Sequence, residues 1–292
     1  MSAATPPVGG IRSLAPPVRR VPVASRVGRA LLPAYTALVV AYLFLPIVVM
    51  AAFGFNDIQG RFNFTWQGFT LDHWQNLFNR YPQLNEALVN SLIVATVSTL
   101  VATTLGTLIG LALTRYEFGG RGPLNLLIFL PIATPEIVLG ASLLALFVSV
   151  GVTRDLPTII IAHIMFNISY VVVTVRARIA GFNRALEEAA MDLGADEWTT
   201  FRKVTFPLIF PGILAAALLA FALSIDDFVI TQFTAGSTQT FPLWVYGASR
   251  IGVPPQVNVM GTLIFGVALV GIVGWILLQR RELSAAPTRT DR

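Results

Sequence analysis

The sequence contains no cysteine, only two histidines and a single lysine, and these shortages exclude several classes of protein. Without cysteine, the chain can form neither a disulfide framework nor a thiolate metal site. His73 and His163 stand far apart, without the spacing that is typical of metal ligands. A metalloenzyme is therefore disfavoured, and we expect no cofactor to be bound by this chain.

Charged residues are also scarce. Only 12% of the 292 residues are charged, 55% are hydrophobic and the mean hydropathy is +0.71, which is too apolar for a soluble domain of this length. The pI of about 10.1 does not indicate a nucleic-acid partner, because the basic residues form short clusters between long apolar runs. The composition therefore predicts an all-α integral membrane protein in contact with the lipid bilayer.

Six apolar stretches are long enough to cross a membrane. A hydrocarbon core of about 30 Å needs about 20 apolar residues in helical conformation. The stretches that meet this test are Leu31–Phe53, Leu88–Leu113, Leu124–Val150, Thr158–Val175, Pro207–Thr231 and Val259–Leu278. We predict a six-helix membrane domain over residues 31–280, in which the first span is an uncleaved anchor because it is too long for a signal-peptide core.

The distribution of lysine and arginine predicts the orientation of these spans. If the N-terminus is cytoplasmic, sixteen of these residues lie on the inner side and four on the outer side. Cytoplasmic segments carry such an excess, and an even number of spans then places both termini in the cytoplasm. Residues 1–30, rich in proline and arginine, are predicted to be a disordered cytoplasmic tail, and residues 281–292 form a second tail.

Two connections are longer than the others. The outer loop, from about Gly54 to Ala87, is aromatic and polar, and we expect it to lie along the membrane interface as an amphipathic cap. The inner loop, over residues 179–206, begins with good helix formers. Gly194 can end that helix in a left-handed conformation, Asp196 can cap a second short helix, and Pro207 suits the first turn of the fifth span. A small helix-turn-helix projection of this kind is well shaped to dock into a groove of another protein.

The chain lacks the motifs of an ATPase or a hydrolase. A phosphate-binding Walker loop needs a glycine-rich stretch that ends in lysine, but the only lysine, Lys203, is not in such a loop. A Gly-x-Ser-x-Gly elbow is also absent from the sequence. If the protein depends on ATP, a separate polypeptide must hydrolyse it.

The inner loop resembles a known family. Glu188-Ala189-Ala190, followed after three residues by Gly194 and after nine more by Val204, Phe206 and Pro207, is similar to the EAA loop of binding-protein-dependent ABC importers. Valine and phenylalanine stand where that pattern usually has isoleucine and leucine, and both changes are conservative. The resemblance implies a six-helix type I importer permease in the bacterial inner membrane.

In that family the loop forms coupling helices that sit in a cleft of the ATP-binding subunit. The resemblance therefore implies that the following residues contact the ATPase: Glu187, Glu188, Ala189, Ala190, Asp192, Gly194, Ala195, Phe201, Arg202 and Pro207. The implied partners are a homologous permease subunit, expected to be a different chain, two ATP-binding subunits that hold ATP and Mg²⁺, and an extracytoplasmic substrate-binding protein.

Three acidic residues fall within the predicted spans, where a carboxylate is costly to bury and marks a candidate functional site. Glu136 lies near the middle of the third span, directly after Pro131 and Pro135, which would free backbone carbonyls along an aqueous path. Asp226 and Asp227 lie in the outer half of the fifth span. The alternatives are that Glu136 only ties helices together, and that the aspartate pair is hydrated or forms a cap at the outer surface.

The segments around Ser224–Phe233, Gln239–Tyr246 and Arg250–Asn258 are similar to one branch of the family, the second permease subunit of spermidine/putrescine importers. A polyamine is a polycation, so carboxylates and aromatic faces favour its passage. The pathway candidates are Glu136, Asp226, Asp227, Phe228, Trp244 and Tyr246. Related permeases for ferric iron, aminoethylphosphonate or other small solutes remain alternatives.

Two other classes of function are alternatives to an importer. A membrane-embedded enzyme could use these carboxylates as acid–base groups, and an ion-coupled secondary carrier could use them to carry protons. Neither class needs a docking loop of the kind found between the fourth and fifth spans. The loop therefore favours a non-catalytic permease subunit.

Overall fold

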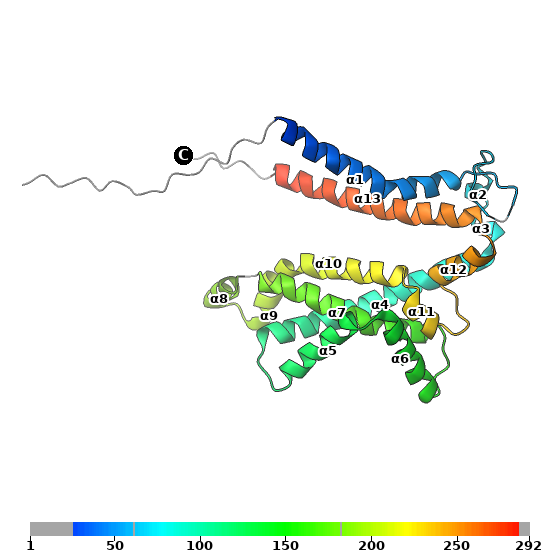
Figure 1. The fold of residues 1–292 in the computed structure, drawn as a ribbon. Coiled ribbons are helices and arrows are strands. Elements are labelled where there is room, and N and C mark those ends of the chain that lie inside the picture. Colours follow the sequence, from blue (N-terminus) through cyan, green and yellow to red (C-terminus); the bar gives the residue numbers. More distant parts are fainter. Residues whose placement is uncertain (1–25, 61, 182, 286–292) are drawn as a thin grey trace, which may run out of the picture. The chain divides into compact units, whose positions relative to one another are not determined.

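The computed structural model describes residues 26–60, 62–181 and 183–285, most of which are helical (Figure 1). The elements in chain order are α1 (Arg26–Phe53), α2 (Asp72–Gln75), α3 (Leu77–Arg80), α4 (Pro82–Arg115), α5 (Arg121–Ala133), α6 (Glu136–Ser149), α7 (Leu156–Ala180), α8 (Ala185–Asp192), α9 (Glu197–Thr200), the π-helical turn η1 (Phe201–Thr205), α10 (Phe206–Ile225), α11 (Val229–Thr234), α12 (Phe241–Ile251) and α13 (Pro255–Ala285).

The chain divides after Met50 into two compact units, and α1 up to that point is the described part of the first. Its segment Leu31–Phe53 is long and apolar enough to span a membrane, and its most apolar window is not buried. Such an exposed apolar surface suits lipid rather than water. Residues 26–30, which the sequence assigned to the tail, begin this helix, and the remainder of the predicted N-terminal tail lies outside the described residues.

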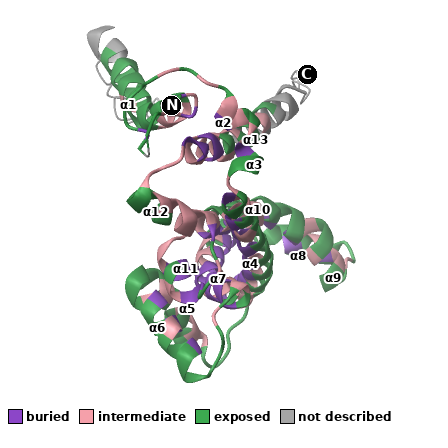
Figure 2. Ribbon diagram, turned by 90° about the vertical axis from the view of Figure 1, so that its right-hand side faces the viewer, coloured by how far each residue is buried: buried purple, intermediate pink, exposed green. Residues whose placement is uncertain are grey.

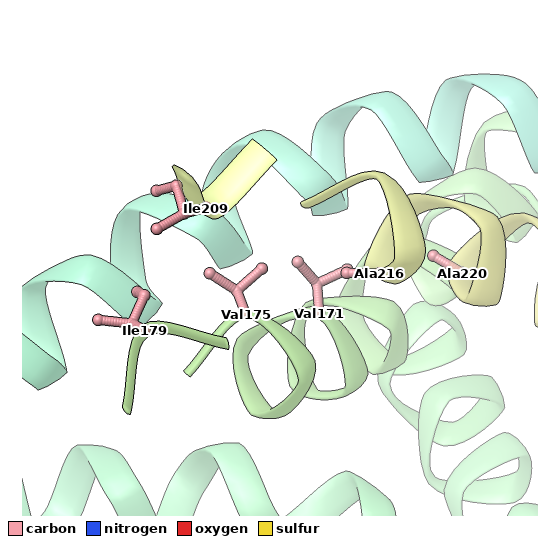
Figure 3. Close-up of a cluster of buried hydrophobic side chains, with 6 residues drawn as sticks. All are labelled: Val171, Val175, Ile179, Ile209, Ala216 and Ala220. Atoms are coloured by element: carbon pink, nitrogen blue, oxygen red, sulfur yellow. The ribbon is translucent and has the colours of Figure 1, made fainter. Parts of the chain in front are cut away.

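The core of the second unit is formed by α4, α7 and α10, which pack against one another along their lengths. Figure 2 shows the buried residues gathered among these helices, whereas α6 and α8 are largely exposed. One apolar cluster joins α7 to α10 (Figure 3) and consists of Val171, Val175, Ile179, Ile209, Ala216 and Ala220. The two alanines let the helix backbones approach closely, as is usual where membrane helices pack.

Gly106 allows α4 to approach α7. A Cβ atom at this position would lie 2.6 Å from the Cγ1 and 2.8 Å from the Cβ of Val171. Because a valine side chain is stiff in a helix, Gly106→Val is expected to destabilise the chain by about 1–3 kcal/mol through overpacking. The measurement is the thermal unfolding midpoint in detergent. Gly266→Val in α13 is the control, since a Cβ there meets nothing within 4 Å, and equal midpoints for the two variants would contradict the prediction.

The predicted third span, Leu124–Val150, is not one straight helix. It consists of α5 and α6, which bend by 110° at the break between Ala133 and Glu136 (Figure 1). Thr134 is extended (φ −84°, ψ 131°) because the ring of Pro135 disfavours a helical residue before it. The prediction of a membrane span over this segment stays a prediction, and the interruption of the helix directly before Pro135 agrees with the expectation that prolines free backbone carbonyls here.

The predicted fifth span, Pro207–Thr231, also ends earlier than expected. α10 stops at Ile225, and α11 begins at Val229 after a short non-helical link. At the other end, α9, η1 and α10 run together as a helical stretch from Glu197 to Ile225. In the described residues, four helices are long and apolar enough to span a membrane, or five if the bent pair counts as one. The prediction of six spans and cytoplasmic termini stays a prediction.

The outer loop is organised around Asn56, whose side chain is fully buried. Its Nδ2 donates to the carbonyl oxygen of Thr65 at 2.8 Å, and its Oδ1 accepts from the backbone N–H of Gln67 at 2.7 Å. The aromatic rings of Phe64 and Phe69 remain exposed around this core. The loop thus has an ordered polar centre and an apolar outer surface, consistent with the predicted interfacial cap.

Candidate functional site

The inner loop folds as a helical hairpin, as predicted. α8 ends just before Gly194, whose φ of +89° lies in the left-handed region. Asp196 accepts a hydrogen bond from the backbone N–H of Thr199 at 3.1 Å and caps α9. Hydrogen bonding from Thr199 also lowers the pKa of Asp196, so its carboxylate stays charged at neutral pH. The prediction that these two residues make the turn and the cap is confirmed.

The hairpin is continuous with the fifth span. The turn η1 links α9 to α10, and Pro207 lies in the first turn of α10 as expected. The N–H of Phe206 bonds to the carbonyl of Phe201, a π-type bond one residue longer than an α-helical one. α9 and α10 are therefore joined by an unbroken helical backbone.

Glu187 anchors the hairpin to the membrane domain. Its side chain is only 5% exposed, and its carboxylate accepts hydrogen bonds from the guanidinium of Arg115 at the end of α4 and from the hydroxyl of Thr205 in η1. The sequence grouped Glu187 with the residues that contact a partner. Because this carboxylate is enclosed, it instead positions the loop and does not belong to its exposed surface.

The exposed surface of the hairpin includes several predicted coupling residues. Glu188, Ala189, Asp192, Gly194, Arg202 and Pro207 are exposed, whereas Ala190, Ala195 and Phe201 are partly buried. Sequence reasoning missed two apolar members of this surface, Leu193 at 90% exposure and Trp198 at 66%. Large apolar side chains that project from a polar loop indicate a contact with another protein.

The second group of candidates lies at the break between α10 and α11, where the two aspartates separate. Asp227 is directed into the protein: its Oδ2 accepts from the N–H and the hydroxyl of Thr231 at 2.8 Å and 2.7 Å, and lies 3.4 Å from Nε2 of the buried His163. Asp226 is exposed and lines a cavity. Both had been expected inside a continuous fifth span, and they instead lie where the helix is interrupted.

The cavity at this break has a volume of about 460 Å³ and is mostly apolar. Among its described lining residues, Asp226 supplies the only carboxylate, while Phe228 and Tyr246 supply aromatic faces. The rings of these two residues lie 4.5 Å apart between centroids. The guanidinium of Arg250 sits 4.6 Å from the centre of the Tyr246 ring, so one face of this ring is occupied by a cation of the protein itself.

The remaining pathway candidates lie elsewhere. Glu136 is exposed as the first residue of α6, directly after the bend, and does not line the cavity of Asp226. Trp244 packs with Tyr81 at a ring distance of 6.0 Å in an apolar cluster around Val259. The structure thus brings together three of the six predicted pathway residues and separates the other three from them.

A family model described as "Binding-protein-dependent transport system inner membrane component" matches residues 102–281, which include the hairpin and both breaks. The chain belongs to this family. It is a multi-pass permease of the bacterial inner membrane, as the sequence predicted. Among the described residues, no group of three potential metal ligands is present.

Named relatives of this permease match over most of its length. It is 37% identical to the spermidine/putrescine transport system permease protein PotC of Escherichia coli K12, over 87% of this chain and 96% of PotC. It is 35% identical to PotC of Haemophilus influenzae, over 85% and 96% of the two chains. The putrescine transport system permease protein PotI of E. coli K12 is also 35% identical, over 82% and 88%.

Solved structures support the permease fold. A chain of a bacterial ABC transporter that imports the acidic polysaccharide alginate matches with a TM-score of 0.64 at 18% identity, over 87% of this permease and 97% of that chain. A chain of the inward-facing MetNI methionine ABC transporter matches with a TM-score of 0.52 at 17% identity, over 71% and 95%. At these identities the likeness establishes the fold of an ABC transporter permease and not the substrate.

Proposed function

We propose that this permease forms half of the pathway of an ATP-driven polyamine importer, with spermidine or putrescine as substrate. The observation that carries the proposal is the cavity in which a carboxylate, Asp226, stands with the rings of Phe228 and Tyr246. A polyamine combines ammonium groups with apolar methylene segments. A mostly apolar cavity with one negative charge and three aromatic rings, those of Phe228, Phe241 and Tyr246, complements both parts of such a molecule.

The named relatives support this substrate class over the alternatives. Three relatives that are 35–37% identical over most of the chain carry the names of spermidine/putrescine or putrescine permeases. A ferric ion or a phosphonate would need several oxygen ligands or a cluster of basic groups. The cavity has one described carboxylate among apolar walls, which fits neither of these solutes as well as it fits a polyamine.

For the rest of the machinery, we propose that a homologous permease completes the pathway and that two separate ATP-binding subunits hydrolyse ATP. The exposed surface of α8 and α9, with Leu193 and Trp198 at its apolar part, is proposed to sit in a cleft of one ATPase. A substrate-binding protein would deliver the polyamine on the opposite side. Closure of the ATPases would move the hairpin and, through η1, displace α10 and the break that carries Asp226.

The test of this function is uptake of labelled spermidine into proteoliposomes that contain the permease with its partner subunits. We expect uptake to require ATP and to be inhibited by unlabelled putrescine but not by amino acids, ferric iron or phosphonates. ATP-dependent uptake of another solute would refute the polyamine assignment and keep the importer. Uptake driven by a proton gradient without ATP would refute the importer itself.

The role of the hairpin is tested by Gly194→Asp. A Cβ at Gly194 meets nothing within 4 Å, so the cost is the left-handed backbone itself, about 1–2 kcal/mol for a residue with a side chain. The turn is expected to rearrange and to uncouple ATP hydrolysis from uptake, so that hydrolysis continues without transport. The control is Gly181→Asp, in the same loop but with φ of −84°, and equal coupling in both variants would contradict the proposal.

A further inference from the structure

A second cavity, of about 500 Å³, lies between the ends of α4, α5 and α7 that face the predicted cytoplasmic side. α5 contributes Arg121, Asn125 and Phe129, and α7 contributes Arg176 and Ala177. The cavity is separate from both sites described above and shares none of their lining residues. It combines two guanidinium groups with apolar walls.

The positive charge in this cavity is not matched by acidic groups. None of the described residues that line it is acidic. Arg176 donates to the amide oxygen of Asn125 at 2.7 Å, which orients the guanidinium without neutralising it. Arg121 lies 4.0 Å from Glu117, whose side chain is 95% exposed, so water screens this pair strongly. The N-terminus of α5, which begins at Arg121 without a side-chain cap, adds a partial positive charge.

The position of the cavity indicates what supplies the missing negative charge. α4 ends at Arg115, α5 begins at Arg121 and α7 ends at Ala180, so the cavity lies at the ends of three apolar helices, where the sequence predicts the cytoplasmic boundary of the membrane. Next to it, α5 exposes large apolar side chains, including Leu126 and Leu130 at 69% and 55%. The exposed apolar face of α5 lies next to Arg121 and Arg176. A lipid matches this arrangement, because its acyl chains can lie along the helix while its phosphate contacts the two guanidinium groups.

We infer that this cavity binds the headgroup of an anionic phospholipid. Arg176, held by Asn125, and Arg121 contact the phosphodiester, and Phe129 borders the upper part of the acyl chains. Because Arg176 lies on α7 and α7 packs against α10, a bound lipid stabilises the end of the bundle from which the hairpin projects. The inference concerns a binding site of this permease and is independent of which solute it transports.

The experiment uses the full permease in phosphatidylcholine nanodiscs, with or without phosphatidylglycerol, and counts the lipids that remain bound in native mass spectrometry. We expect one phosphatidylglycerol to be retained in preference to phosphatidylcholine. Each of Arg121→Gln and Arg176→Gln is expected to weaken this retention about fivefold, because one arginine near a membrane surface contributes about that much attraction. Arg176→Lys keeps the charge and is expected to retain part of the binding.

The control is Arg184→Gln, which removes an exposed positive charge on the same side but outside the cavity. It is expected to leave retention unchanged, and circular dichroism checks that every variant is folded. Equal retention by the Arg121→Gln/Arg176→Gln double variant and the parent protein would overturn the inference. Displacement of the lipid by inorganic phosphate would indicate a free-anion site instead. Release of a partner subunit by Arg176→Glu with lipid retention unchanged would assign the cavity to a protein contact.

Discussion

Asp226→Asn is expected to reduce polyamine uptake by at least about tenfold, equivalent to ~1.4 kcal/mol, while the amount of folded protein stays unchanged. The physical reason is that Asp226 is exposed at the break between α10 and α11. Among the described residues that line the cavity at this break, it is the only one with a carboxylate. An asparagine has nearly the same shape but cannot form an ion pair with an ammonium group. The measurement is the initial rate of ATP-dependent spermidine uptake as a function of spermidine concentration.

The neighbouring residue provides a matched control, because Asp227→Asn is the same chemical change one position along. Asp227 accepts two hydrogen bonds from Thr231 and lies beside His163, so its replacement introduces an amide N–H₂ group among existing donors. We expect the second variant to lower the thermal unfolding midpoint and the yield of the permease. A result in which the two variants behave alike, or in which Asp226→Asn transports normally, would contradict the division of roles between the two aspartates.

Glu187→Ala is expected to destabilise the permease by about 3 kcal/mol and to abolish coupled transport, because it leaves the guanidinium of Arg115 without its carboxylate. Thr205 loses the same acceptor, so the contact between α8 and η1 is broken as well. Alanine is a good helix former, and the loss does not arise from the helix itself. The measurements are the unfolding midpoint of the purified chain and ATP-dependent uptake by the assembled transporter.

Glu188→Ala is the matched variant, since it makes the same substitution on the same helix at an exposed carboxylate. It is expected to leave the unfolding midpoint unchanged and to weaken only the association with the ATPase. Equal midpoints for the two variants would mean that Glu187 does not anchor the hairpin, whatever their transport rates. Normal coupled uptake by the Glu188→Ala variant would instead remove the Glu188 carboxylate from the coupling surface.

The local features of the coupling loop could be predicted because they depend on residues close together in the sequence. Gly194 favours the left-handed turn, Asp196 caps the next helix through a bond three residues away, and Pro207 lies in a first helical turn. Burial of Glu187 could not be predicted in this way. Its partners Arg115 and Thr205 come from α4 and η1, and the sequence contains no local signal that joins them.

The positions of the pathway residues were less predictable from the sequence than those of the loop residues. Carboxylates in apolar stretches were recognised from the sequence, but the interruption of the fifth span at Asp226 was not, since apolar residues resume at Phe228 and Val229. Two prolines before Glu136 predicted free backbone carbonyls, but the bend of 110° between α5 and α6 was not predicted, and α6 packs against α11 after this bend. Gly140 permits this packing, because a Cβ there would lie 2.5 Å from the ring of Phe233.

The sequence by itself determined that this protein is a helical membrane protein with a helix-turn-helix loop between two apolar spans, because hydropathy and turn chemistry act through composition and near neighbours. The permease class came from the resemblance of that loop to the EAA loop of importers. Only the tertiary structure decided which carboxylates are turned inward and which are exposed. It turned Asp227 and Glu187 inward to partners on other helices and left Asp226 and Glu188 exposed. The reason is that burial of a carboxylate depends on donors brought from distant parts of the chain, and adjacent identical residues differ only in the direction in which the backbone presents them.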